Sequence, residues 1–375
     1  MKPATAYPED VYLMALASIR GMTIGLLRRV EETFGGAEEI FRAGEHRIAS
    51  VLGGNHAMFS DSSLRTALTA AYEEYSWATG NNVRILSYRN SSYPKRLLDC
   101  TDAPPVLYAV GDTDLNARHV IAMVGTRHAT TYGLSFIKNF VEDLSQKIPD
   151  ALIISGLAYG IDVAAHREAM SSGLLTAGVV AHGLSTIYPA VHRDVASRMI
   201  KAGGAILSDY RHDAPIHKGN FLARNRIVAG LSDAVIVVES AVKGGAIATA
   251  RLAAGYDRDV FAVPGRATDI YSGGCNRLIY KNAATILTSA DDLIEAMGWT
   301  AVHKEEGHQE TLVMELDAES QRVLDYLTHN GETAMSRLSV DLNLPVTRLI
   351  QLLGEMEFNG LILNLPGGRY GAIRP

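Results

Sequence analysis

Cationic, amide and aromatic side chains gather within ten residues near the middle of the chain. The segment HKGNFLARNR holds six of them: Lys218, Asn220, Phe221, Arg224, Asn225 and Arg226. Lysine and arginine bind phosphates, and an aromatic ring accepts the face of an unpaired base. This combination indicates a single-stranded nucleic acid as ligand. The alternatives are a core position for the phenyl ring and a solvated or ion-paired face for the arginines.

A second group of chemically useful residues follows the apolar run VIAMV at residues 120–124. Gly125 turns the chain, Arg127 supplies a guanidinium, and Thr130 or Thr131 can cap a following helix. A turn, a fixed cation and free helix N–H groups in one place favour an anion site. The alternative is an ordinary strand-to-helix turn that carries a surface arginine.

Glycine-rich turns follow two further apolar runs. In SGLAYGID, Gly156 and Gly160 allow backbone N–H groups to approach a ligand. In KGGAIATA, Lys243 precedes Gly244 and Gly245 at the start of a predicted helix, which favours a second anion cradle. Several such turns on one edge of a sheet suit a polyanion, or a nucleotide with several phosphates.

Other motifs that would indicate catalysis or metal binding are missing from the sequence. There is no Walker A pattern, no GxGxxG after the first run, no Ser-His-Asp order and no paired-carboxylate motif. Asp162 and His166 are four residues apart, and we expect a hydrogen-bonded pair that orients the loop rather than a metal pair. We expect the ring of Tyr188 to be buried. Two cysteines, Cys100 and Cys275, give no disulfide framework and favour a reducing cytoplasm.

The elements that must position these groups follow from an alternation of short apolar runs and helix-like segments between residues 120 and 297. The alternation predicts an α/β fold with a doubly wound, Rossmann-like, mostly parallel sheet. The predicted strands are residues 120–124, 152–154, 177–181, 205–207, 234–238 and 260–263. The predicted helices are residues 131–147, 162–172, 190–202, 222–231 and 245–255. Ligands of such sheets bind at the C-terminal ends of the strands, where the groups above are expected to meet.

The remaining sequence predicts two smaller domains and a linker. Residues 1–76 read as a helical domain of the SAM or helix-hairpin-helix kind, with a plain helical packing module as the alternative. Residues 77–298 form the extended Rossmann-like domain, including an arm with strand-like pieces at 83–86 and 106–110. Residues 299–318 are an acidic linker that we expect to be mobile.

Residues 319–375 predict a winged-helix-like domain: helices at 319–328, 333–341 and 345–357, then a hairpin. A winged helix that reads DNA has a basic third helix. Here that helix offers Arg348 against Glu355 and Glu357. We therefore expect a protein contact or regulatory role for this domain.

Charge is distributed unevenly along the 375 residues. The formal net charge is −6, which argues against a protein that coats nucleic acid without selection. Residues 118–230 carry 12 Lys and Arg against 8 Asp and Glu, whereas residues 299–319 carry 1 against 6. Positive charge is thus a local property of the first half of the sheet domain. No apolar run has membrane-spanning length, and we expect no membrane association.

Six motifs of the sheet domain occur in a specific order. They are GTRHATTYG, SGLAYGIDVAAH, the Tyr188-Pro189 step, FLARNRIVAGLSDAVIVVES, KGGAIATA, and FAVPG followed by GGCNRLI. In these motifs the chain resembles the DNA processing protein A family (DprA, also called Smf). The match continues ahead of the sheet in YPKRLLDCTDAPPVLYAVG.

The resemblance implies a function as well as a fold. It implies a Rossmann-like domain that binds and protects single-stranded DNA, dimerises, and helps load the RecA recombinase in natural transformation, without catalysis, metal or cofactor. It assigns a phosphate pocket to Arg127, Lys218 and Arg224, and a base-stacking ring to Phe221. Further DNA-binding residues are expected at Asn225, Gly156, Lys243, Gly244 and Gly245.

The chain departs from the family pattern at two places. Gly244-Gly245 stands where the family commonly has a serine-glycine pair, and Asn282 stands where glycine is usual. The enzymatic alternative is a nucleoside-monophosphate phosphoribohydrolase of the lysine-decarboxylase-like type, which shares the sheet architecture. That group has a PGGxGTxxE turn, and KGGAIATA lacks its glycine-threonine pair and its glutamate. A scaffold that binds no nucleic acid is the third alternative.

Overall fold

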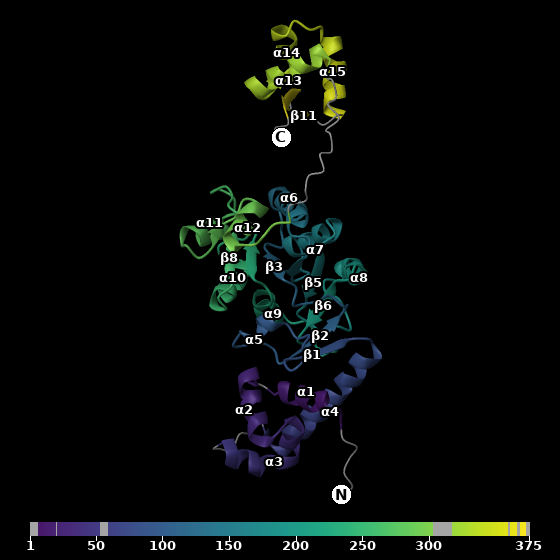
Figure 1. Cartoon of the computed structure of the whole chain (residues 1–375), viewed down its shortest axis with the longest axis vertical. Coiled ribbons are helices and arrows are strands. Elements are labelled where there is room, and N and C mark those ends of the chain that lie inside the picture. Colours follow the sequence, from purple (N-terminus) through teal and green to yellow (C-terminus); the bar gives the residue numbers. More distant parts are fainter. Residues whose placement is uncertain are drawn as a thin grey trace. The chain divides into compact units, whose positions relative to one another are not determined.

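A computed structural model describes residues 7–19, 21–52, 59–302, 317–358, 361–365 and 368–372 (Figure 1). The chain separates into two compact units, Met1–Lys304 and Glu305–Pro375. Most of the linker predicted to be mobile, at positions 303–316, lies outside the described residues, as do Pro366 and Gly367 of the predicted hairpin. The finer division of the first unit at residue 76 remains a prediction.

Four helices form the N-terminal part of the first unit. They are α1 (Glu9–Ala17), α2 (Ile24–Phe34), α3 (Ala37–Leu52) and α4 (Asp61–Gly80). Thr23 caps α2 by accepting a hydrogen bond from the backbone of Leu26, and Gly35 ends it with φ of 87°. Their apolar faces join the same hydrophobic core as one face of the sheet, so the helices and the sheet pack as one body.

A nine-stranded sheet forms the centre of the first unit, in the order β1-β2-β6-β5-β4-β3-β7-β8-β9. Its strands are β1 (Arg84–Ser87), β2 (Val106–Val110), β3 (His119–Val124), β4 (Ala151–Ser155), β5 (Leu175–Val179), β6 (Ala205–Ser208), β7 (Ala234–Val237), β8 (Asp259–Ala262) and β9 (Thr285–Ile286). All neighbouring pairs are parallel except β1 with β2 and β2 with β6. The predicted α/β, mostly parallel architecture is confirmed.

Helices cover both faces of this sheet. One face carries α6 (Thr131–Lys147), α7 (Ile161–Ser171), α8 (Arg193–Lys201) and α12 (Ala290–Met297); the other carries α5 (Lys95–Leu98), α9 (Lys218–Leu231), α10 (Gly245–Gly255) and α11 (Gly273–Tyr280). Strand β3 shows why its sequence is continuously apolar. Ile121 and Met123 pack in the α6 core, whereas Val120 and Ala122 pack in the α9 core.

The order of the strands creates a crevice at one sheet edge. The chain runs from β3 through β4 and β5 to β6, and α9 then returns it to β7 on the other side of β3. Because α6 follows β3 onto one face and α10 follows β7 onto the other, the chain diverges at the C-terminal ends of β3 and β7. This is the position at which doubly wound sheets bind ligands.

Several predicted elements differ from the structure in their bounds; the helix predicted at 190–202, for example, is a 3-10 turn at Ala190–His192 followed by α8. The strand expected at 177–181 is β5 at Leu175–Val179; residues 180 and 181 are buried beyond its end, and the N–H of Val180 still donates to the carbonyl of Leu207 in β6 at 2.8 Å. The helix expected from residue 222 begins at Lys218. Its start is set by His217, whose ring nitrogen accepts a hydrogen bond from the backbone of Gly219.

The second unit has winged-helix order, as predicted. It contains α13 (Ala318–Asn330), β10 (Thr333–Ala334), α14 (Met335–Asp341), α15 (Val346–Phe358), β11 (Ile362–Leu365) and β12 (Arg369–Ala372), with sheet order β10-β12-β11. Arg348 of α15 pairs with Glu319 at 2.8 Å and with Asp317 at 3.2 Å. Its charge is therefore compensated within the unit.

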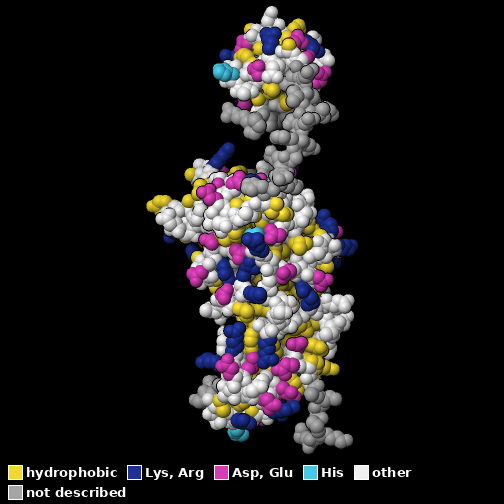
Figure 2. All heavy atoms as spheres, in the orientation of Figure 1, with side chains coloured by type: hydrophobic (Ala, Val, Ile, Leu, Met, Phe, Trp, Pro, Cys, Tyr) yellow, Lys and Arg dark blue, Asp and Glu magenta, His cyan; other side chains and the backbone are white. Residues whose placement is uncertain are grey.

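Both signs of charge occur together on the face of the protein that Figure 2 draws. Figure 2 shows Lys and Arg interspersed with Asp and Glu on the face in view. This mixture is consistent with the formal net charge of −6. Among the described helices, none combines the length and apolarity needed to cross a membrane.

Candidate nucleic-acid interface

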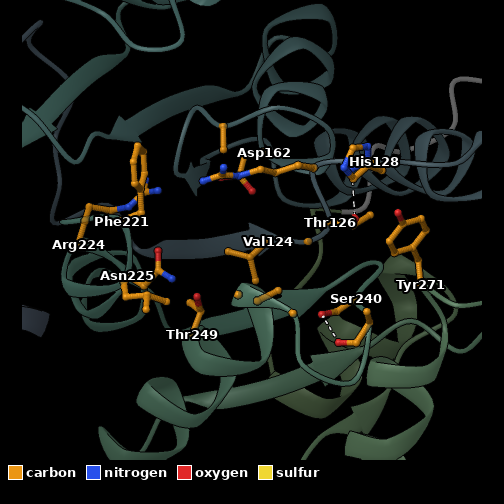
Figure 3. A pocket seen from close by; sticks show the side chains of 18 residues that line it. Val124, Thr126, His128, Asp162, Phe221, Arg224, Asn225, Ser240, Thr249 and Tyr271 are labelled. Carbon is orange, nitrogen blue, oxygen red and sulfur yellow. Dashed lines mark hydrogen bonds between the residues drawn. The ribbon is translucent and has the colours of Figure 1, made fainter. Parts of the chain in front are cut away.

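A cavity of about 370 Å³ lies where β3 and β7 end, and we call it the switch-point cavity. Its wall comes from the turn after β3, the start of α7, the first half of α9, the loop after β7 and the start of α10. Figure 3 shows Phe221 and Asn225 toward one end and His128 and Tyr271 toward the other. The sheet topology therefore brings segments that are distant in sequence to one hollow.

The turn after β3 is held by backbone contacts. The N–H of Thr126 donates to the carbonyl of Glu239 at 2.7 Å, and its own carbonyl accepts from the N–H of Ile161 at 3.1 Å. Gly160 has φ of 75°, and a Cβ there would lie 2.2 Å from the carbonyl oxygen of Thr126. Only glycine allows this approach. The turn thus gives exposed Arg127 a fixed base.

Arg127 and two aromatic rings meet at one end of the switch-point cavity. The guanidinium carbon of Arg127 lies 5.2 Å from the centroid of the Phe221 ring, within cation–π distance. The Tyr188 ring lies 5.9 Å from Phe221 at an interplanar angle of 53°. Phe221 is partly exposed rather than a fully buried core residue. A cation and adjacent ring faces are thus accessible together.

The expected burial of Tyr188 is wrong. The residue is 41% exposed. The contact that holds it is made by its backbone, because the N–H of Tyr188 donates to the ring of His182 at 3.1 Å. His182 in turn donates through its other ring nitrogen to the carbonyl of Gly183. The backbone of Tyr188 is thus held in place, and its ring stays exposed to solvent beside Phe221.

The N-terminus of α10 faces the switch-point cavity. Gly244 is the N-cap residue and makes no side-chain cap, and Gly244, Gly245 and Ala246 line the cavity. A Cβ at Gly244 would lie 2.2 Å from the hydroxyl oxygen of Ser240, so a larger residue there would require the Ser240 side chain to turn. The first-turn N–H groups of a helix attract anions. This helix end is the part of the cavity best suited to a phosphate.

The N-terminus of α6, by contrast, is occupied by a carboxylate of the chain itself. Buried Glu239 accepts hydrogen bonds from the N–H and the hydroxyl of Thr130, and a Cβ at Gly133 would lie 2.4 Å from Glu239 Oε2. The expectation of free N–H groups and an anion site at this helix start is therefore wrong. The sequence could not show it, because Glu239 follows a different strand.

Arg224 is a nearly buried residue of the cavity floor. It is 4% exposed and donates a hydrogen bond to the carbonyl of Val179. Burial lowers the pKa of its guanidinium, and the neighbouring carboxylate of Asp162 opposes this effect. A Cβ at Gly156 would lie 2.2 Å from Arg224 Nη1, so Gly156 makes room for the guanidinium. Arg224 supports the site from below.

The expected Asp162–His166 pair does not form among the described residues. His166 is fully buried, and its Nδ1 lies 2.6 Å from the hydroxyl of Thr176. Burial, with smaller contributions from Arg224 and His192, lowers the pKa of His166 to about 3. Asp162 lines the cavity instead; burial raises its pKa, and Arg224 opposes that shift. The spacing of four positions between Asp162 and His166 does not show that the two side chains have different partners in the folded protein.

The structure brings together most of the site residues predicted from the sequence. Those that line the switch-point cavity are Arg127, Phe221, Arg224, Asn225, Gly244 and Gly245. Gly156 lines a smaller depression that it shares with Arg127 and Phe221. Lys218 and Lys243 are exposed and lie outside the lining of the cavity.

Sequence reasoning assigned Phe221 to the site but did not assign aromatic groups to the other end of the cavity. The rings of His128 and Tyr271 lie 6.2 Å apart at 20°. Tyr271 lies in the loop between β8 and α11, directly ahead of Ser272-Gly273-Gly274. From the sequence alone, this segment is only a glycine-rich turn after the last predicted strand. Both residues follow strands that end at this edge, and that position was the available signal.

Comparison with known proteins agrees with the fold and with the resemblance in sequence. Residues 84–298, more than half of the chain, match the family described as DNA recombination-mediator protein A. The chain belongs to this family. Residues 309–368 also match the DprA winged helix domain.

Several individual relatives are similar to the chain. Protein Smf of Escherichia coli is 32% identical over 296 residues, which are 78% of each chain. DNA processing protein DprA of Bacillus subtilis is 37% identical over 229 residues, 61% of this chain and 74% of that protein.

Two solved structures of DNA processing protein A are similar to the chain. The Streptococcus pneumoniae structure has a TM-score of 0.65 and 27% identity, and the match covers 78% of this chain and 98% of that one. The Helicobacter pylori structure, which describes that protein's single-stranded DNA binding mode, has a TM-score of 0.51 and 33% identity over 57% of this chain and 95% of that one.

Proposed function

We propose that the chain binds single-stranded DNA at the switch-point cavity, as a non-catalytic cytoplasmic protein of natural transformation and recombination. The observation that carries this proposal is the position of Arg127 over the Phe221 ring, beside the uncapped N-terminus of α10. A phosphate would bind at Arg127 and the helix N-terminus, and a base would stack on Phe221 or Tyr188. A duplex offers no free base face, so the arrangement favours unpaired strands.

The other predicted site residues have distinct parts in this proposal. Lys218 supplies positive charge at the start of α9, and Asn225 can donate or accept a hydrogen bond at the cavity wall. Arg224 and Gly156 keep the floor in place. Lys243 lies next to the α10 cradle in sequence and adds to the local potential.

The absence of catalysis is proposed from the chemistry of the wall. Among the described residues that line the cavity, Asp162 is the only carboxylate, and it interacts with Arg224. Hydrolysis of a glycosidic bond needs an acid or base within reach of the bond, commonly as a pair of carboxylates. The phosphoribohydrolase alternative predicts release of free base from AMP, and we expect none.

Fluorescence anisotropy with a labelled oligothymidylate and a duplex of the same length tests DNA binding. We expect tight binding of the single strand and weak binding of the duplex. Phe221→Ala should lose about 1–3 kcal/mol of binding free energy with the salt dependence unchanged. Lys218→Ala should reduce the slope of log affinity against log salt by about one, while Lys138→Ala on α6 should change neither quantity. Equal affinity for both DNAs would refute the proposal.

We further propose that the protein protects incoming strands, loads RecA and works as a homodimer through the Rossmann-like domain. The support is its membership of the DprA family. Light scattering should give twice the chain mass of 40.4 kDa. The protein should shorten the lag of RecA-dependent ATP hydrolysis on an oligothymidylate coated with single-strand binding protein. An unchanged lag would refute the RecA role and leave the DNA-binding proposal standing.

A further inference from the structure

A second cavity of about 630 Å³ lies beside the C-terminal end of α1, and we call it the α1-side cavity. Three segments line it: the end of α1 with the turn into α2, the segment that leads into β2, and the residues after β6. Arg226 of α9 completes the wall. Its lining shares no residue with that of the switch-point cavity.

An ion pair in this wall keeps an unused donor and an unused acceptor. Arg226 Nη2 donates to Asp209 Oδ2. Arg226 Nη1 and Asp209 Oδ1 are both buried and, among the described residues, have no hydrogen-bond partner. Buried polar groups are almost always paired, so such a pair of groups at the wall of a cavity points to a ligand.

The rest of the wall limits the charge of that ligand. Among the described lining residues, Asp102 and Asp209 are balanced by Arg211 and Arg226. A polyanion would meet two carboxylates, whereas a neutral molecule meets no net charge.

The remaining wall favours a ligand with flat apolar faces. Met14, Ile19 and Met22 provide apolar surface on one side, and Pro104 and Pro105 provide it on another. A volume of this size and a position between packed parts of a unit are typical of small-molecule sites.

We propose that the α1-side cavity binds a nucleobase that carries a ring N–H next to a carbonyl, as thymine, uracil and guanine do. Because Asp209 Oδ1 and Arg226 Nη1 are enclosed by the surrounding protein, the two side chains would turn toward the cavity on binding. The ring N–H would then donate to Asp209 Oδ1, and the carbonyl would accept from Arg226 Nη1. The flat faces of the base would contact the methionine and proline side chains. This assignment does not depend on the DNA-binding proposal, because the two cavities have separate walls.

Ligand-observed NMR on the full chain, with thymidine and N3-methylthymidine as probes, tests the proposal. The methyl group replaces the hydrogen of the one N–H that would donate to Asp209, and it leaves the ring and the sugar otherwise unchanged. We expect saturation transfer to thymidine and at least a tenfold weaker effect for N3-methylthymidine. Equal transfer to both probes, or no transfer to thymidine at millimolar concentration because water alone fills the cavity, would overturn the proposal.

Three variants locate the binding. Ala17→Leu fills the cavity from α1 without touching the ion pair, and Asp209→Asn removes the carboxylate; both should abolish thymidine binding. Phe221→Ala alters only the switch-point cavity and should leave it unchanged. If Phe221→Ala lost thymidine binding and Ala17→Leu kept it, the nucleoside would be bound in the switch-point cavity, and the proposal would be overturned. Circular dichroism and melting curves confirm that each variant is folded.

The base can belong to a free nucleoside or to a DNA strand, and one competition experiment separates the two. In the Phe221→Ala variant, an oligothymidylate that displaces thymidine identifies a strand as the source. An oligothymidylate that fails to displace it identifies a free nucleoside. Either outcome sustains the assignment of a nucleobase to the α1-side cavity, whatever the affinity of the switch-point cavity for DNA.

Discussion

Replacement of Gly156 by alanine would place a methyl carbon 2.2 Å from Nη1 and 2.5 Å from Nη2 of Arg224. The end of an arginine side chain usually moves aside at little cost. Here it has no such freedom, because Arg224 is 4% exposed, donates to the carbonyl of Val179 and neutralises buried Asp162. Either the backbone at residue 156 shifts or the guanidinium gives up its partners.

The expected cost follows from these two routes. Overpacking in a dense interior costs about 1–3 kcal/mol, and leaving a buried carbonyl unpaired costs a similar amount. We therefore expect Gly156→Ala to lower the free energy of unfolding by about 1–3 kcal/mol. The matched control is Gly255→Ala at the end of α10, where an added Cβ meets nothing within 4 Å. That change should be neutral, or stabilising by up to about 1 kcal/mol.

Urea unfolding followed by circular dichroism measures both variants. The unfolding midpoint of Gly156→Ala should lie clearly below that of the wild type, and the midpoint of Gly255→Ala at or above it. Affinity for single-stranded DNA should also fall in Gly156→Ala, because the displaced guanidinium forms the floor of the switch-point cavity. Equal midpoints for the two variants would show that the Arg224 side chain can move aside at little cost.

Three further predictions concern other parts of the chain. Glu74→Gln should lower the free energy of unfolding, measured in urea, by about 1–3 kcal/mol. The buried carboxylate accepts hydrogen bonds from the backbone N–H and the ring of His212 at 2.9 and 2.6 Å, whereas the NH2 group of a glutamine would face one of these donors. Burial lowers the pKa of His166 to about 3, below the ordinary value of about 6.5, so the unfolded chain takes up a proton that the folded chain excludes. The stabilisation from neutral His166 should therefore be fully present above pH 6.5 and should be lost as the pH falls toward 3. In melting curves, His166→Gln should lose part of this acid dependence. A chain ended after residue 304 should keep its DNA affinity and salt slope in the anisotropy assay, since Arg348 is paired within the second unit.

The fold was predictable because its signals are local. Residues 120–124 are apolar at every position, and the structure buries alternate side chains in two different cores. The predicted limits of α6 and α10, residues 131–147 and 245–255, agree with the structure. Thr130 at the first helix and two glycines at the second are start signals that need no tertiary context.

The roles of individual cations were not predictable in the same way. Arg224 and Arg226 are neighbours in one motif, but side chains two residues apart on a helix point in different directions. Arg224 is buried under Gly156, and Arg226 pairs with Asp209 at the α1-side cavity. Arg127, almost a hundred residues earlier, is the arginine beside Phe221. Sequence reports the charge of each residue, whereas its partner is fixed only when the sheet is assembled.

Glu239 bears on how an acidic chain could present the proposed anion site with a defined direction. Its carboxylate closes the N-terminus of α6, whereas the N-terminus of α10 on the other side of the crevice has no side-chain cap at Gly244. Charges on the protein surface are screened beyond about 8 Å at physiological salt, so the net charge of −6 has little effect within the cavity. Because Asp162 and Arg224 of the cavity wall offset each other, the local potential depends mainly on Arg127 and on one uncapped helix end. A strand bound in this way would be oriented, with its phosphate toward α10 and its base toward Phe221.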